Sequence, residues 1–100
     1  MTTVSFERSG GVIGNELQFD INLNTIPDDE AIQILRLIDK SDFFNIPENL
    51  AGSTSPDEFQ YEIKVDNGGD VHTVRTTDTT MPEDLRPLVR ELTMMKILRK

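Results

Sequence analysis

The sequence has no cysteine and only one histidine, His72. Without thiols the chain can form neither disulfides nor thiolate metal sites, which suits a reducing compartment. It contains no HExxH pair, no Cys/His cluster and no Walker-type loop, so the residues for zinc hydrolysis or phosphate-loop chemistry are missing. We therefore expect no enzyme, no catalytic residues, no metal and no cofactor. The lone histidine is interpreted as a cross-strand neighbour.

Long apolar runs are also missing from the chain. No stretch approaches the roughly 20 apolar residues that a membrane span needs. Residues 1–7 have neither the basic region nor the apolar region of a signal peptide. We expect a cytoplasmic protein, with export by a signal-independent route as the alternative.

Basic residues are scarce, and they are distributed unevenly. The formal net charge is −8, with 15 acidic and 5 basic residues before residue 83, but 3 acidic and 5 basic residues from Glu83 onward. Phosphate binding needs clustered lysine and arginine, and anionic membranes attract the same residues. We therefore expect neither nucleic acid nor a membrane as partner. The acidic body serves either to attract a basic protein or simply to keep the chain soluble.

The periodicity of apolar residues predicts six elements in one domain, residues 1–100. Apolar and polar residues alternate over 2–8, 17–23 and 59–66, which predicts strands. Residues 71–77 are rich in β-branched residues but have no clear buried face, so they are predicted to return as an edge strand that completes the second of two hairpins. Residues 28–41, and the chain from about 85 onward, have helical apolar spacing. Thr80 and Glu83 have the spacing of a capping box before the second helix. The order ββαββα predicts an α+β fold, a four-stranded antiparallel sheet with two helices on one face, and we expect a monomer.

Three glycines lie within five positions between the first two predicted strands, namely Gly10, Gly11 and Gly14. Glycine permits positive φ and the close approach of another backbone, so this segment is predicted to form the tip of the first hairpin. Val12 and Ile13 lie between the second and third glycines. Two interpretations are open, because these apolar side chains either tuck into the end of the sheet or meet a partner.

Five short segments, in order along the chain, carry a resemblance to a known family. They are Phe6–Gly11 with Gly14, Phe43–Pro47, Asp57–Tyr61, His72–Arg75 and Leu85–Leu88. Together they resemble the emfourin family, proteinaceous inhibitors of protealysin-like metallopeptidases of the thermolysin type. The resemblance extends from about Val4 to Leu92. It implies a compact α+β inhibitor that blocks a zinc peptidase and needs no metal of its own.

The resemblance also implies where the peptidase binds. The expected protease-binding residues are those of the glycine-rich loop, Arg8, Ser9, Gly10, Gly11, Val12, Ile13 and Gly14. Thermolysin-like enzymes are expected to accept a bulky apolar residue just after the scissile bond. We therefore expect the loop to lie in the active-site cleft, with Val12 or Ile13 in or near the apolar pocket.

The topology decides whether the turn at Asn67, Gly68 and Gly69 assists as a secondary contact. We expect residues 43–56 to start at the glycine-loop end of the domain. If the third strand descends from there, the turn lies at the far end, which we favour. If the connection crosses the domain, which about ten residues could do over roughly 30 Å, the turn joins the binding edge.

A different class of function is kept as the alternative to inhibition. The chain would then be a non-catalytic adaptor or subunit that binds another protein through a sheet edge or the C-terminal helix. The end of that helix supports this alternative, because Met94, Met95, Ile97 and Leu98 make it apolar on several sides.

Overall fold

The computed structural model describes residues 2–10, 16–50 and 58–98 of the chain. Its elements follow the predicted order ββαββα, with three short 3-10 turns added. In chain order they are β1 (Thr3–Gly10), β2 (Leu17–Asn22), η1 (Leu23–Thr25), α1 (Asp28–Lys40), η2 (Phe43–Asn45), β3 (Phe59–Asp66), β4 (Val71–Thr77), η3 (Glu83–Leu85) and α2 (Arg86–Leu98).

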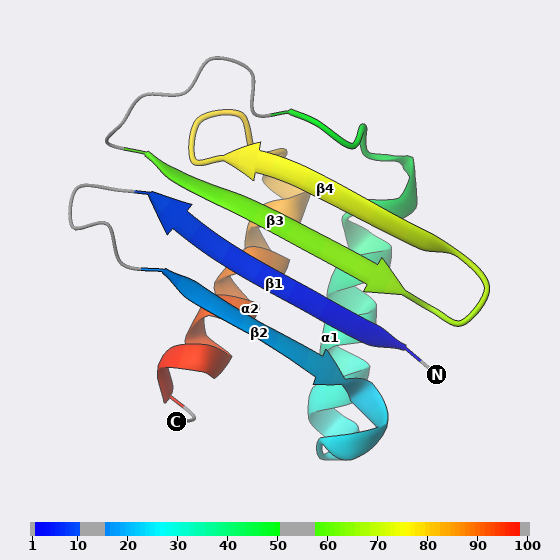
Figure 1. Cartoon of the computed structure of the whole chain (residues 1–100). Coiled ribbons are helices and arrows are strands. Elements are labelled where there is room, and N and C mark those ends of the chain that lie inside the picture. The colour runs from blue at the N-terminus through cyan, green and yellow to red at the C-terminus, as the bar shows by residue number, and fades with distance from the viewer. Residues whose placement is uncertain (1, 11–15, 51–57, 99–100) are drawn as a thin grey trace.

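The four strands form one antiparallel sheet in the order β2-β1-β3-β4, and both helices lie on one of its faces (Figure 1). The predicted α+β fold is therefore confirmed. We call the two ends of the sheet the loop end and the turn end. At the loop end Gly10 of β1 pairs with Phe59 of β3, and at the turn end Thr3 pairs with Asp66.

The core lies between the sheet and the two helices. Alternate residues of β1 and β3 point toward the helices, so Val4, Phe6, Ile63 and Val65 are almost completely buried. The two helices and the turn η3 contribute the matching layer, which includes Ile34, Leu85, Leu88 and Leu92. Full burial of each large apolar side chain contributes about 1.5–3 kcal/mol, so this layer holds the sheet and helices together.

Both helices begin where their local sequence favours a helix start. The first turn of α1 carries Asp28, Asp29 and Glu30, whose charges complement the positive end of the helix dipole. Pro87 is the second residue of α2, where its missing N–H group costs nothing. The predicted capping box is wrong, because Thr80 bonds to the backbone N–H group of Thr77 instead. Pro82 precedes η3, and no side chain caps that turn.

The course of α1 corrects a second expectation. The helix crosses the strands from the β2 side to the β4 side, rather than returning along them to the loop end (Figure 1). Residues after it therefore start beside the beginning of β4, where the rings of Phe43 and His72 lie 5.6 Å apart. His72 donates through Nε2 to the carbonyl oxygen of Ile46 at 2.6 Å. It is a packing residue of the edge strand, as its interpretation as a strand neighbour suggested.

The chain then runs along the outer side of β4. The N–H group of Arg75 donates to the carbonyl oxygen of Glu48, and that of Leu50 donates to the carbonyl oxygen of Arg75, both at 2.7 Å. These bonds cover part of the β4 edge, which the sequence predicted to be an edge strand. Among the described residues, no helix has the length and apolarity that crossing a membrane requires.

Candidate functional site

Strand β1 continues two residues beyond its predicted end. Ser9 and Gly10 were expected in a loop, but they pair with Gln60 and Phe59 of β3. Three of the predicted binding residues, Arg8, Ser9 and Gly10, therefore belong to a central strand at the loop end of the sheet. The other four, Gly11, Val12, Ile13 and Gly14, lie outside the described residues.

Gly10 occupies a position that only glycine fits without strain. Its φ is +83°, and a Cβ atom built on it would lie 2.9 Å from the carbonyl oxygen of Glu58. A side chain would meet both the left-handed backbone penalty and a backbone clash. The glycine thus lets β1 approach the start of β3 closely just before the glycine-rich segment begins.

Side chains from the turn after β4 hold the start of β3 in place. The carboxylate of Glu58 accepts hydrogen bonds from the N–H group of Thr79 at 2.8 Å and from its hydroxyl at 2.6 Å. The carboxylate of Asp78 accepts from the N–H group of Phe59 at 3.0 Å and from the hydroxyl of Tyr61 at 2.8 Å. Two carboxylates therefore tie together segments that lie about twenty residues apart in sequence.

The Tyr61 hydroxyl belongs to this network and is shielded from water. Only 8% of Tyr61 is exposed. Burial raises the pKa of Tyr61 well above its ordinary value, and the hydrogen bond and negative charge of Asp78 raise it further. The raised pKa keeps the phenol neutral, and therefore a donor to Asp78, to higher pH than for an ordinary tyrosine.

Arg8 lies on the helix side of the sheet, in the alternation that buries Val4 and Phe6. Its guanidinium carbon lies 4.2 Å from the centre of the Phe59 ring, a cation–π contact. Arg86 of α2 reaches the same region and donates through Nη2 to the carbonyl oxygen of Asp78 at 3.0 Å. The base of the glycine-rich segment is therefore packed against α2 as well as against β3.

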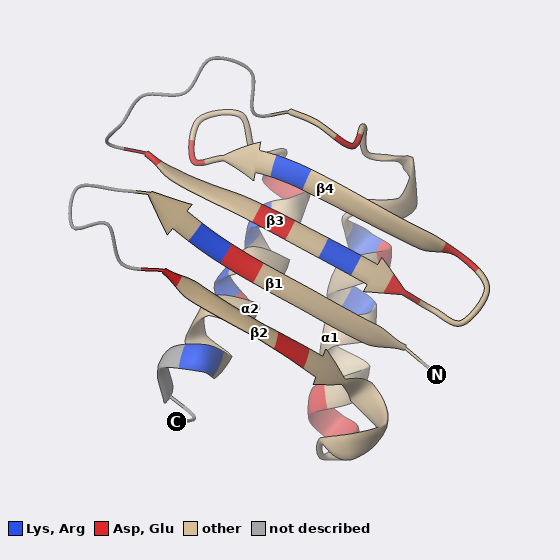
Figure 2. Cartoon of the chain, in the orientation of Figure 1, with Lys and Arg blue, Asp and Glu red and all other residues tan. Residues whose placement is uncertain are grey.

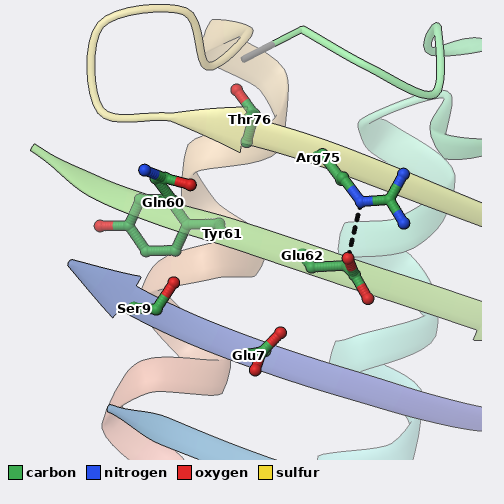
Figure 3. Close-up of a pocket in the computed structure, with 7 residues that line it drawn as sticks. All are labelled: Glu7, Ser9, Gln60, Tyr61, Glu62, Arg75 and Thr76. Carbon is green, nitrogen blue, oxygen red and sulfur yellow. Dashed lines mark hydrogen bonds and ion pairs between the residues drawn. The ribbon is translucent and has the colours of Figure 1, made fainter. Parts of the chain in front are cut away.

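Among the described residues, no helix covers the opposite face of the sheet, and charged residues lie along its strands (Figure 2). Near the loop end it is hollowed by about 170 Å³, with Glu7, Ser9, Gln60, Glu62 and Arg75 along the rim (Figure 3). Arg75 donates through Nε to Glu62 at 2.7 Å. Within the described ranges, no three histidine, aspartate or glutamate side chains gather as metal ligands.

The second predicted contact, the turn at Asn67, Gly68 and Gly69, lies at the turn end of the sheet. Asp66, the residue before this turn, pairs with Val71 of β4 across the turn and with Thr3 at the start of β1. The favoured position of this turn, at the far end from the glycine-rich loop, is thus confirmed, although the segment after α1 starts at the turn end and not, as expected, at the loop end.

Sequence reasoning missed the residues that brace the loop end. Glu58 was named only as part of a family segment, and Asp78 and Thr79 were not singled out. A signal existed in the run Thr76-Thr77-Asp78-Thr79-Thr80, because such short polar side chains favour hydrogen bonds to backbone groups in turns.

Taken together, the fold and this site define a small α+β domain with a braced hairpin end suited to binding another protein. The chain belongs to the emfourin family, because the sequence model of that family matches residues 6–93. This is a family of inhibitors, and membership indicates a metallopeptidase inhibitor rather than an enzyme. No curated protein and no solved structure matches the chain.

Proposed function

We propose that this protein inhibits a thermolysin-type, protealysin-like zinc metallopeptidase by placing the segment from Ser9 to Gly14 in its active-site cleft, with Arg8 as a further binding residue. The observation that carries the proposal is the anchoring of Gly10. A glycine-only backbone position lies against Glu58, which Thr79 holds in turn. Because Gly10 is held in place before binding, this base of the segment loses little conformational entropy when a peptidase binds.

The chemistry of the segment suits the cleft of such an enzyme. Gly11-Val12 and Val12-Ile13 each offer a bulky apolar residue after a peptide bond, which thermolysin-type enzymes are expected to accept. The zinc ion in this proposal belongs to the peptidase, and the inhibitor brings no metal or cofactor. Inhibition arises from occupancy, because a carbonyl held out of alignment with the attacking water is not hydrolysed. The free inhibitor is proposed to be monomeric and to act in the cytoplasm.

The experiment compares two valine-to-aspartate variants against thermolysin or a protealysin-like enzyme with a peptide substrate. Val12→Asp should weaken inhibition by about 100-fold or more, because a desolvated carboxylate is costly in an apolar pocket. Val71→Asp is the matched control, since Val71 is 56% exposed and lies at the turn end. It should inhibit as the wild type does.

The outcomes separate the hypotheses. Absence of inhibition by the wild-type protein at high molar excess would overturn the proposal. Equal inhibition by wild type and Val12→Asp, with both folded by circular dichroism, would keep an inhibitor but remove the loop from the cleft. A loss of inhibition confined to Val71→Asp would keep an inhibitor but move its contact to the β4 edge, and would overturn the loop proposal.

A further inference from the structure

A cavity of about 240 Å³ lies on the helix side of the loop end, between the sheet and α2. Its wall contains three arginines, and we refer to it as the arginine pocket. Its lining residues include Arg8, Tyr61, Asp78, Arg86, Arg90 and Met94. Arg8 lies only two residues before Gly10, so a protein that contacts the glycine-rich segment would lie beside this pocket.

The residues of α2 reach the pocket along one stripe of the helix. Arg86, Arg90 and Met94 are spaced by four residues, so their side chains point to the same side. Arg90 is exposed, and Met94 is 45% exposed. The pocket therefore has an accessible rim with one positive and one apolar side chain.

The positive charge of the pocket is only partly compensated. Both carboxylate oxygens of Asp78 already accept hydrogen bonds, from the N–H group of Phe59 and the Tyr61 hydroxyl. Arg86 uses Nε on Glu83 and Nη2 on the carbonyl oxygen of Asp78. Among the lining residues, Asp78 is the single carboxylate, whereas three residues carry guanidinium groups.

Two of the arginines retain donors without partners. Among the described residues, Nε of Arg8 is buried and has no hydrogen-bond partner. The ion pairs of the described residues join Arg75 with Glu62 and Arg86 with Glu83, so Arg90 takes part in none of them. The exposed guanidinium of Arg90 is the one that an incoming side chain can reach, and a carboxylate can accept from a guanidinium through two parallel bonds.

We propose that the arginine pocket receives an aspartate or glutamate side chain of the peptidase, at the rim of the cleft that the glycine-rich segment occupies. This inference rests on the proposed function. A chain with a net charge of −8 repels acidic surfaces in general, whereas this pocket is locally positive beside the binding segment. The contact therefore adds specificity and a faster association rate to the apolar contact of the loop.

The test reverses one charge in the pocket and the same charge elsewhere. Arg90→Glu places a carboxylate at the rim, and Arg36→Glu makes the same change on the exposed surface of α1. The inhibition constant against thermolysin is measured for each variant in low salt and in about 1 M salt, where the Debye length falls to about 3 Å. Each value is divided by the wild-type value at the same salt.

Arg90→Glu should weaken inhibition by about tenfold or more in low salt, and the ratio should shrink in high salt. Arg36→Glu should stay within about twofold of the wild type, because a charge outside the contact acts only through a screened field. Arg90→Gln serves as a second variant that removes the charge without adding repulsion. Its inhibition constant should lie between those of Arg90→Glu and Arg36→Glu.

Equal effects of Arg90→Glu and Arg36→Glu would overturn the pocket while leaving the loop proposal intact, provided Val12→Asp still abolishes inhibition. A loss with Arg90→Glu that does not depend on salt, or that accompanies a lowered melting temperature, would also overturn it. Failure of the wild type to inhibit is the separate result that removes both proposals.

Discussion

At the turn end of the sheet the chain reverses through hydrogen bonds that are all local, whereas at the loop end it is held from a distance. Asn67 accepts from the N–H groups of Gly69 and Asp70, two and three residues away. Asp78 and Glu58 instead make bonds that span 17 to 21 residues. The two ends belong to the same strands but are stabilised by different parts of the sequence.

This contrast distinguishes a turn that only connects two strands from a segment that binds a partner. A turn that only joins β3 to β4 needs residues that reverse the chain, and Asn67-Gly68-Gly69 supplies them locally. A segment that binds a partner gains from a base that does not move, which requires contacts from several elements. The loop end receives such contacts from β3, from the turn after β4 and from α2.

The largest difference between the ends should come from the same substitution at two glycines. Gly10→Ala should lower the free energy of unfolding by about 2–3 kcal/mol, because of its positive φ and the contact with the Glu58 carbonyl oxygen. Gly69→Ala should change it by less than about 0.5 kcal/mol, since its nearest neighbour would lie 3.8 Å away. Urea unfolding measures both values, and equal losses would contradict the contrast.

Gly10→Ala should also weaken peptidase inhibition by about tenfold or more, since displacing the base displaces the segment that follows it. Gly69→Ala should inhibit like the wild type. A folded Gly10→Ala protein with unchanged inhibition would show that the anchoring of Gly10 does not matter for binding.

A smaller difference should separate two side chains that each accept two hydrogen bonds. Asp78→Ala leaves the Phe59 N–H group and the part-buried Tyr61 hydroxyl without their acceptor, so we expect a loss of about 2 kcal/mol. Asn67→Ala removes two bonds that are exposed to water, and we expect a loss below about 1 kcal/mol. Thermal unfolding followed by circular dichroism ranks the two, and the reverse order would break the comparison.

The sequence predicted the elements of this fold well, because each has a period that belongs to one kind of structure. The alternation over residues 17–23 and 59–66 identified strands. The acidic residues that follow Pro27 placed the start of α1 at Asp28, and the predicted end of this helix lies one residue beyond the observed end at Lys40. The burial side of α1 was less clear. Leu35 has helical apolar spacing, yet it is 45% exposed because α1 packs through Ile34 and Ile38.

What could not be predicted depends on contacts between distant segments. The pairing of β1 with β3 extends β1 to Gly10, and nothing local near Ser9 encodes that partner. The direction of α1 across the sheet likewise follows from packing, so the start of the segment 43–56 was expected at the wrong end of the sheet. The glycine-rich segment was singled out from its composition, whereas the contacts of Asp78 and Thr79 depend on β4 ending beside the start of β3.

The last comparison concerns ionisation at the loop end, which a single chromophore reports. Tyr61 is the only tyrosine in the chain, so the ultraviolet absorbance of tyrosinate follows its ionisation alone. In the folded protein this absorbance should appear only well above the ordinary pKa of about 10, because burial and Asp78 both raise the pKa of Tyr61. In urea the same protein should titrate near pH 10.

Stability should follow the same ionisation. Because the folded pKa of Tyr61 lies above the unfolded value, the contribution of Tyr61 is fully present below about pH 10 and is lost as pH rises through the folded pKa. Asp78→Ala should lower the folded pKa only part of the way, since burial is the larger cause and remains. A folded protein that titrates at the unfolded value would mean that water reaches the Tyr61 hydroxyl, and the loop end would then be no better braced than the turn end.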